Sequence, residues 1–555
     1  MLGPLMRVAL SVGASRFRGK FLFDTRRAQA VNDALLMGLL RRNEGTVYGR
    51  RYGFSRLSTP DGYRASVPLT SYPDYEPYVA RIARGEQGVL TMEPVHHLGL
   101  SSGTTGKQKM IPITRTAQRQ VALSMVFLSQ GMLNAALPAS RGRGVLMMSA
   151  GTSGKTEAGI TYGPATASGM ASMIRMSKHL WTTPPDALVL LDQRTVLHLH
   201  LLFGLKERDL RYLSATFASS IMDLFHLLER AGPVLAEELA TGKLSDELNL
   251  SGESRARLEA ALGKDPGRAR QLLDELARGH DGIARRLWPR LEYVNTVTGG
   301  SFAVYAQKLR PYLGGVPLFS SVYASTEGVI GVATKSEDTS YAMVPSACYF
   351  ELLPAGEVDS AAPRTVTLEE AQDGEHYEVV LTNRSGFYRY RLGDMVKVVG
   401  RLHRTPVVEF LFRRGQLLNL SGEKTSEQAA LAAVMDSAKR WGTPLIDFTT
   451  QADADAAPAR YVFFVEVKEP AALVGRATAA DDLDQALGKA NPRYEAAREA
   501  GKLGRPVLHP VKPETFARVK ALLIEKGASI NQVKIPRVVG AGDVLQLLRA
   551  SGAGV

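Results

Sequence analysis

The sequence predicts an α/β protein in which a large, multi-layer N-terminal domain of β-sheets and helices is followed by a smaller α+β domain. Three observations support this fold class. The chain has 555 residues, enough for two or more domains of about 100–200 residues each. Helical and strand-like segments alternate up to Leu287, and a cluster of strand-like segments begins at Leu291, which is typical of layered α/β folds. The composition changes again after Arg414, so we place the domains at residues 1–414 and 415–555.

Helices are predicted where apolar residues recur at helical spacing. Residues 1–23 are basic, and Pro4 and Arg7 interrupt their short apolar run, so we expect an amphipathic starting helix rather than a signal peptide; an organellar transit peptide is the alternative. Residues 28–42 end in arginines, which suit a helix C-terminus, and Ser71 caps a short helix that runs to Arg84. Residues 49–68 are predicted to be irregular. Further helices are expected at residues 116–137, within 207–243 and 251–287, and at 427–440 and 481–499.

Strands are predicted at short apolar, β-branched and aromatic runs. These runs lie at residues 145–148, 187–191, 293–297, 316–322, 329–334, 347–352, 377–382, 395–399, 407–412 and 461–467. Residues 453–459 and 471–480 read as loops because they are rich in Ala, Asp and Pro or in Ala and Gly.

Composition limits the classes of function. The single cysteine, Cys348, excludes a disulfide scaffold and a cysteine-built metal site. The net charge is +13, but the basic residues are dispersed among acidic ones and form no block with interleaved aromatics. We therefore expect small anionic substrates rather than nucleic acid. The longest apolar patch, residues 195–205, is too short to span a bilayer, and we expect a cytoplasmic, monomeric protein with no membrane partner.

The stretch from Leu98 to Pro112 carries the densest chemical signal. An apolar lead-in, consistent with a strand, runs into Ser101-Ser102-Gly103-Thr104-Thr105-Gly106-Lys107. Glycines let backbone N–H groups approach a ligand, hydroxyls donate hydrogen bonds and lysines supply charge, a combination that suits a polyphosphate. The spacing does not match G-x-x-x-x-G-K-[ST], so the loop is not a P-loop of that kind. An ordinary polar turn is the alternative.

Two further motifs follow predicted strands. The run Y-A-S-T-E-G at residues 323–328 brings a Thr and a Glu to a strand end, where they could reach a phosphate oxygen and Mg²⁺; a polar hairpin turn is the alternative. The run Y-R-Y-R-L-G-D at residues 388–394 ends in Asp394, whose carboxylate could accept both hydroxyls of a ribose. Its alternative is a β-turn with cross-strand arginine pairs.

Taken in this order, the three motifs resemble the acyl-adenylate-forming (ANL) superfamily of ligases. Further stretches resemble one branch of it, the Gretchen Hagen auxin-responsive family of acyl acid amido synthetases. These stretches are V-P-L-T-S-Y-P-D-Y-E-P-Y at 67–78, Y-F-E-L-L-P at 349–354, residues 388–398, G-E-K-T-S-E at 422–427 and N-Q-V-K-I-P-R at 531–537. Together they span nearly the whole chain.

The resemblance implies a role for each matching residue and a mobile C-terminal domain. ATP and Mg²⁺ are the implied cofactors. The β- and γ-phosphates would be bound by Ser101, Ser102, Thr104, Thr105 and Lys107, and the adenine by Gly299, Gly300 and Tyr323. Asp394 would bind the ribose, with Arg413 or Arg414 nearby, and Lys424 would also contact the nucleotide. Thr326 would contact the α-phosphate, Glu327 would hold Mg²⁺, and Lys534 would be the lysine that enters during adenylation.

The implied reaction adenylates a carboxylic acid and passes the acyl group to an amine, expected to be an amino acid. The acid is unspecified; residues 150–175 and 212–225 are partly apolar and aromatic, which favours a hydrophobic or aromatic acid. An acyl-CoA synthetase of the same superfamily is one rival, although V-K-I-P-R around Lys534 lacks the lysine-rich ending common in those ligases. A catalytically silent nucleotide-binding regulator is the other. His96-His97 and His198-x-His200 lack a third ligand at useful spacing and are read as structural.

Overall fold

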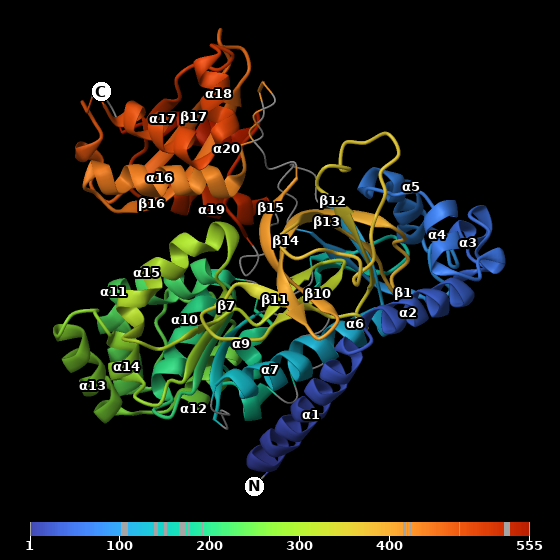
Figure 1. Cartoon of the computed structure of the whole chain (residues 1–555). Helices are drawn as coiled ribbons and strands as arrows, with labels where there is room; N and C mark the ends of the chain where they lie inside the picture. Colours follow the sequence, from blue (N-terminus) through green and yellow to red (C-terminus); the bar gives the residue numbers. More distant parts are fainter. Residues whose placement is uncertain are drawn as a thin grey trace. The chain divides into compact units, whose positions relative to one another are not determined.

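The computed structural model describes residues 2–101, 109–137, 142–148, 153–165, 174, 177–190, 192–414, 418, 420–421, 423, 425–476, 478–526 and 533–553. The chain forms two compact units. Among the described residues, the N-terminal unit holds the chain up to Ser101, Lys109–Leu392 and Val396–Phe410, and the C-terminal unit holds Gly393–Met395 and the chain from Leu411 onward. The predicted α/β fold class is confirmed. Each unit is described by itself, and Figure 1 gives the element labels.

The N-terminal unit begins with helices that the sequence predicts in part. Helices α1 (Leu2–Thr25), α2 (Ala28–Asn43) and α5 (Tyr72–Ala83) lie where they are expected, and a capping box between Ser71 and Asp74 begins α5. The prediction that residues 49–68 are irregular is wrong, because they contain helix α4 (Pro60–Ser66) and the last residues of the short helix α3 (Val47–Arg51). Their signals are caps rather than periodicity: Thr59 accepts the N–H of Gly62, and Pro60 fills the first turn.

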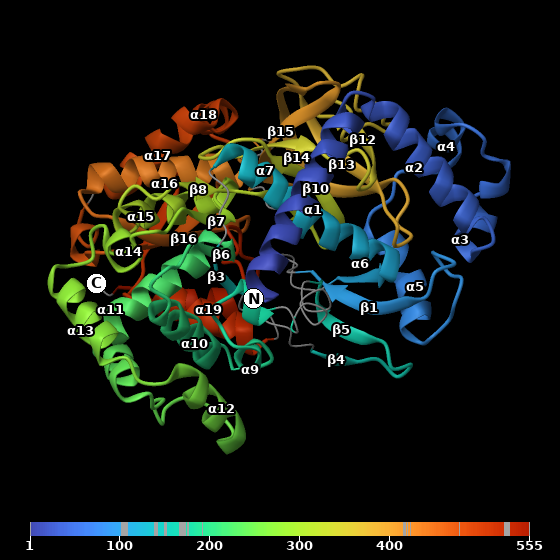
Figure 2. The ribbon, with the colours of Figure 1, turned by 90° about the horizontal axis from the view of Figure 1, so that it is seen from below.

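A small four-stranded sheet, in the order β2-β1-β5-β4, carries the entry to the hydroxyl-rich loop. Strand β1 (Val95–Leu100) pairs antiparallel with β2 (Met110–Thr114) and parallel with β5 (Thr161–Pro164), and β4 is Gly154–Lys155. Figure 2 shows β1, β5 and β4 side by side. Leu98 is fully buried, so the strand end at Leu100 is fixed in place by the core.

Helical segments after β2 form one continuous run with a π-helical interruption. The run consists of α6 (Arg115–Ala122), the π-helical segment η2 (Leu123–Leu128) and α7 (Ser129–Ala136). Helix α1 packs against η2 and α7, where Phe17 stacks on Phe127 with ring centroids 5.3 Å apart. Gly131 allows close approach, since an added Cβ would lie 2.4 Å from the Ala14 carbonyl oxygen.

A second four-stranded sheet is wholly parallel, in the order β3-β6-β7-β8. Its strands are β3 (Gly144–Met147), β6 (Tyr212–Phe217), β7 (Tyr293–Val297) and β8 (Leu318–Phe319). The helices in this part of the chain are α10 (Gln193–Lys206), α11 (Ala218–Thr241), α12 (Gly252–Leu262), α13 (Pro266–Ala277), α14 (Ile283–Leu287) and α15 (Ala303–Leu313). Residues 187–190, the described part of the predicted strand 187–191, do not form a strand: Pro185 and Asp186 begin a helical turn, α9 (Pro185–Leu188). The stretch 207–243 also contains β6 as well as its predicted helix.

The predicted strand cluster forms a seven-stranded sheet in the order β12-β13-β14-β15-β11-β10-β9. Its strands are β9 (Val322–Ser325), β10 (Gly328–Ala333), β11 (Ser340–Met343), β12 (Tyr349–Pro354), β13 (His376–Thr382), β14 (Tyr390–Leu402) and β15 (Thr405–Arg413). Buried aromatic residues join this sheet to the N-terminal helices, as where Tyr75 stacks on Phe387 with ring centroids 4.4 Å apart. The resulting core holds β9 and β14, which carry two of the predicted motifs.

The C-terminal unit has its own sheet and core. Strands β16 (Leu445–Asp453), β17 (Arg460–Val467) and β18 (Val507–Pro510) form the sheet. The helices are α16 (Glu427–Trp441), α17 (Ala479–Ala490), α18 (Pro492–Glu499), α19 (Thr515–Glu525) and α20 (Asp543–Ala550). Phe464, Val519 and Leu548 are buried in a shared apolar cluster. Across the described parts of both units, none of the helices combines the length and apolar character that crossing a membrane requires.

Candidate functional site

The Thr326–Glu327 pair forms the turn of the β9–β10 hairpin, where Ser325 pairs with Gly328. Strand β1 lies directly against this turn: a Cβ added to Gly99 would come within 2.9 Å of the Thr326 methyl group and 3.2 Å of the Ala165 Cβ. The Glu327 carbonyl accepts a hydrogen bond from Asn383 Nδ2 at 2.9 Å. The structure therefore brings the strand that leads into the hydroxyl-rich loop next to the Thr-Glu motif.

Two hydroxyls near these strand ends have no partner. Ser101 Oγ and Ser325 Oγ are buried, and neither makes a hydrogen bond within the described residues. Leaving a buried hydroxyl unsatisfied costs about 1–3 kcal/mol, so such groups mark positions where a polar ligand is expected. Ser102, Thr104, Thr105, Lys107 and Lys424 of the predicted site lie outside the described residues.

The residues predicted to hold adenine converge on an aromatic wall. Tyr323 lies edge-on to Phe410, with ring centroids 5.9 Å apart, and beside Tyr341. Gly300 has a φ of +58°, a left-handed conformation that glycine adopts without strain, and a Cβ added there would touch the Phe410 ring at 3.3 Å. Gly299 precedes it, after the end of β7. The face of an aromatic ring in this group can stack a planar base.

Asp394 lies in the C-terminal unit together with Arg413. Its carboxylate is buried and accepts a hydrogen bond from Arg413 Nε at 2.5 Å, while the Arg413 side chain remains 42% exposed. The Arg414 N–H donates to the Gly393 carbonyl at 2.7 Å. Of the two arginines left open by the sequence, Arg413 places its guanidinium against the Asp394 carboxylate.

The other arginines of the Tyr388–Asp394 motif serve the fold. Arg389 is buried with a φ of +47° and donates to the buried Glu351 carboxylate at 2.8 Å. Arg391 donates to the buried Glu378 at 2.6 Å. The cross-strand pairing weighed from the sequence is therefore present, and it holds the strand that leads to Asp394.

Lys534 lies against an acidic partner in the C-terminal unit. Its Nζ is 3.5 Å from Glu427 Oε1, and Glu427 also faces Arg537 at 3.9 Å. Burial lowers the pKa of Lys534 below its usual value of 10.5, Glu427 acts in the opposite direction, and the charges of Arg537 and Arg413 lower it further. Arg537 is anchored in turn by an ion pair with Asp447. Lys534 is thus a largely buried cation with the Glu427 carboxylate beside it.

Comparison with known proteins agrees with this arrangement. The chain matches the GH3 family N-terminal domain over residues 17–318, the GH3 family central domain over 341–413 and the GH3 family C-terminal domain over 428–542. The chain belongs to the GH3 family.

Its full-length relatives carry related names. A jasmonoyl–L-amino acid synthetase of Nicotiana attenuata is 31% identical to this GH3 family protein, over 95% of this chain and 94% of that one. An indole-3-acetic acid-amido synthetase of Arabidopsis thaliana is 31% identical, over 96% of each chain.

Solved structures resemble this GH3 family protein over the same length. The GH3.15 acyl acid amido synthetase superposes with a TM-score of 0.86 at 28% identity, covering 96% of this chain and 95% of that one. A 2-hydroxyisobutyryl-CoA ligase, at a TM-score of 0.53 and 14% identity over 95% and 92% of the chains, shares the fold alone.

The donor set of this GH3 family protein suits a nucleotide that brings its own metal. No group of three His, Cys, Asp or Glu residues in the described chain is placed to hold a metal ion. The Thr326–Glu327 turn offers one carboxylate and one hydroxyl, and Mg²⁺ is commonly held by one or two carboxylates, water and substrate phosphates. The residues present therefore fit Mg²⁺ bound with ATP.

Three histidines of the predicted pairs, His97, His198 and His200, contact polar side chains. His198 contacts Glu238 at 2.6 Å, and His97 contacts Thr161 at 2.8 Å. Burial lowers the pKa of His200 to about 4, and its ring bonds the Thr183 hydroxyl. These partners account for why the side chains are buried.

Sequence reasoning missed three residues of this site: Phe410, Asn383 and Glu427. Phe410 lies in a predicted strand and Glu427 in a quoted motif, but neither pattern indicates the partner. The ion pair between Lys534 and Glu427, at the start of α16, joins residues that are far apart in the sequence, so no local sequence pattern predicts it.

Proposed function

We propose that this protein is an ATP-dependent acyl acid amido synthetase. It adenylates a carboxylic acid and transfers the acyl group to an amine, an amino acid, with release of pyrophosphate and AMP. The observation that carries the proposal is full-length similarity to amido synthetases together with the contact between the β1 strand end and the Thr326 turn. These ligases form a carbon–nitrogen bond.

The reaction needs two displacements. A carboxylate oxygen of the acid attacks the α-phosphorus of ATP, the bond to the bridging oxygen breaks, and pyrophosphate leaves. The amine nitrogen then attacks the acyl carbon, the carbon–oxygen bond to AMP breaks, and the amine gives up a proton. No protein nucleophile is required, so the residues act by positioning the reactants and stabilising charge.

The predicted residues divide this work. Ser101 and Ser102 with Thr104, Thr105 and Lys107 bind the β- and γ-phosphates, and the buried hydroxyls of Ser101 and Ser325, unpartnered within the described chain, support a polar ligand there. Gly299, Gly300 and Tyr323, with Phe410, hold the adenine.

The remaining roles follow the same plan. Asp394 and Arg413 hold the ribose, Arg414 and Lys424 border the nucleotide, Thr326 contacts the α-phosphate, and Lys534 stabilises the charge that develops on it. Glu327 would hold Mg²⁺, which neutralises phosphate charge when bound. The C-terminal domain, residues 415–555, is proposed to move so that Lys534 reaches the nucleotide. We place the hinge near residues 414–417, of which 415–417 lie outside the described residues. We further propose a monomer that acts in the cytoplasm.

The experiment is a pyrophosphate-release screen over carboxylic acids, followed by mass spectrometry of products formed with mixed amino acids or with CoA. An amide and AMP are expected with at least one acid. An acyl-CoA thioester without amide would establish the rival synthetase. Absence of AMP across the panel would overturn the enzymatic proposal and favour a nucleotide-binding regulator.

A further inference from the structure

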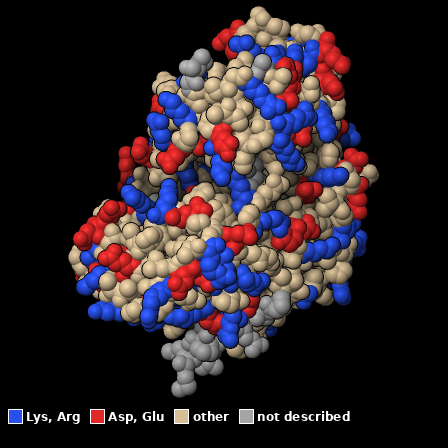
Figure 3. Space-filling view, turned by 90° about the vertical axis from the view of Figure 1, so that its left-hand side faces the viewer, with Lys and Arg blue, Asp and Glu red and all other residues tan. Residues whose placement is uncertain are grey.

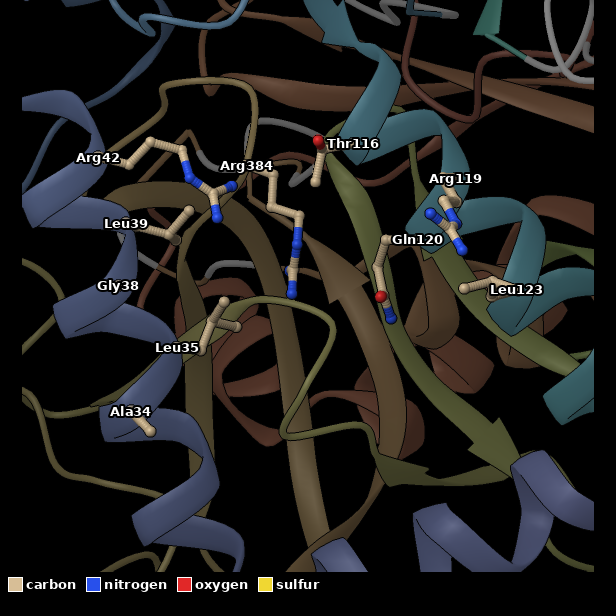
Figure 4. Close-up of a pocket in the computed structure, with 10 residues that line it drawn as sticks. All are labelled: Ala34, Leu35, Gly38, Leu39, Arg42, Thr116, Arg119, Gln120, Leu123 and Arg384. Atoms are coloured by element: carbon tan, nitrogen blue, oxygen red, sulfur yellow. The ribbon is translucent and has the colours of Figure 1, made fainter.

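A cavity of about 410 Å³ opens in the N-terminal unit between α2 and the α6–η2 run. Leu35 and Leu39 from α2 and Leu123 from η2 give it apolar walls (Figure 4). None of its lining residues belongs to the predicted nucleotide site. Its volume lies in the range of about 300–1,000 Å³ that is typical of pockets for small organic ligands.

Three arginines surround the same space. Arg42 reaches from α2 toward Arg384, which follows β13, and Arg119 extends from α6 on the opposite side (Figure 4). Arg384 is anchored by hydrogen bonds from its guanidinium to the carbonyls of Ala347 at 2.6 Å and Ser346 at 3.2 Å. Because it is tied to the backbone, the cation is fixed at the cavity wall.

Arg384 is half-buried, Arg42 and Arg119 are exposed, and none of the three is matched by an acidic side chain among the described residues. Within the described chain, no ion pair joins Arg42, Arg119 or Arg384 to a carboxylate. Glu93 accepts the N–H of Thr116 at 2.8 Å and is not paired with them. Burial lowers the pKa of Arg384, and the charge of Arg42 lowers it further, so the two guanidinium groups repel each other across the cavity. An anion between them would relieve this repulsion.

We propose that this cavity is a second ligand site, which binds a small carboxylate with an aromatic or aliphatic body. The carboxylate lies between Arg42 and Arg384, since a guanidinium binds a carboxylate through two parallel hydrogen bonds. Arg119 adds charge at the cavity mouth. The body of the ligand packs on Leu35, Leu39 and Leu123, where burial of apolar surface stabilises the complex.

Gly38 allows a test that fills the cavity without disturbing the fold. It lines the cavity within α2, and a Cβ added there meets nothing within 4 Å. Leucine is the better helix former, so Gly38→Leu should fold at least as well as the parent protein. Gly19→Leu is the matched control, because Gly19 lies in α1 with equally open space and is not a lining residue of the cavity.

The experiment is calorimetric titration of the full chain with naphthalene-2-carboxylate and with naphthalene-2-carboxamide. We expect a carboxylate-binding event that Gly38→Leu weakens at least tenfold and Gly19→Leu leaves unchanged. Arg42→Gln should weaken the same event about tenfold, while Arg41→Gln, at the adjacent position that does not line the cavity, should not. The changed residues lie outside the proposed active site, so acid bound there should give the same heat in every variant. The difference between the isotherms of the parent protein and the variants therefore measures binding in the cavity.

Two results would overturn the proposal. One is an isotherm for Gly38→Leu that matches the parent protein while its melting temperature is unchanged. The other is equal affinity for the carboxylate and the carboxamide, which would mean that the arginines recognise no charge.

Discussion

At the scale of single residues, the surroundings of Lys534 favour an interaction between its ammonium and a phosphate. Its ammonium is largely removed from water and has one carboxylate, Glu427, beside it. A cation held this way costs free energy in the resting fold. The same cation would gain most from a phosphate with developing negative charge, which is the arrangement that the proposed adenylation requires.

Lys534→Ala should lower the rate of acid-dependent pyrophosphate release by about 10²–10³-fold, as expected for loss of one electrostatic contact to the transition state. ATP affinity should remain within a few-fold of the parent value. Steady-state kinetics and nucleotide titration measure the two quantities. Lys526→Ala, which removes an exposed lysine of the same unit, serves as control. An unimpaired adenylation rate in Lys534→Ala would contradict the assigned role.

The stability of the C-terminal unit should depend on pH through the same lysine. Because the pKa of Lys534 is lower in the folded state, the unfolded state binds more protons between that pKa and 10.5. The unfolding free energy therefore rises with pH across this window, and the cost of the charge is fully present below it. In Lys534→Met this rise should disappear and stability at pH 7 should increase. Urea unfolding at pH 7 and pH 9.5 tests both points; an identical pH slope in the two proteins would refute them.

At the scale of elements, the contact between β1 and the β9–β10 turn positions the site. Gly99 pairs with Ile111 on one side and Gly163 on the other, so the strand cannot shift to make room for a side chain. The absence of a side chain at Gly99 is what lets Thr326 sit against β1. The hairpin turn is thus held by packing, and by the Asn383 hydrogen bond to its backbone.

Gly99→Ala should displace Thr326 and reduce acid-dependent pyrophosphate release by about 10–100-fold, since a misplacement near 1 Å can cost about 10²-fold. Its added methyl group would also press on Ile113 at 3.0 Å. Gly356→Ala, where an added Cβ meets nothing within 4 Å, is the matched control. Equal activity in the two variants would show that the turn tolerates movement.

Elements with strong local signals were predicted well, and weak ones were not. Helix α2 follows its apolar spacing, and β13 and β17 follow their β-branched and aromatic runs. The run at 187–191 is apolar but short, and such runs do not distinguish a strand from a buried helical turn. Pro185 and Asp186 decided the outcome there, because they favour a helix N-terminus.

At the scale of the whole molecule, the two compact units have separate apolar cores. Leu548 belongs to the C-terminal core, and Leu224 belongs to the core around the parallel sheet. Units with separate cores can unfold in separate steps. Basic residues are distributed over the face shown in Figure 3, with acidic residues among them, in keeping with the dispersal seen in the sequence.

Leu548→Ala should destabilise the C-terminal unit by about 2–5 kcal/mol and lower one thermal transition, leaving the other in place. Leu224→Ala should lower the other transition instead. Differential scanning calorimetry of the full chain measures both. A single transition that moves equally in the two variants would mean that the units unfold together.

The sequence by itself determined the family, the α/β class and the identity of the polar groups available to bind a nucleotide, because these depend on local composition and on motifs in a fixed order. Only the tertiary structure decided which charges are compensated. Arg389 meets Glu351, Lys534 meets Glu427, and the three arginines at the α2–α6 cavity meet no carboxylate in the described chain. Electrostatic free energy depends on burial and on neighbours within a few ångströms, and the fold draws those neighbours from distant parts of the chain.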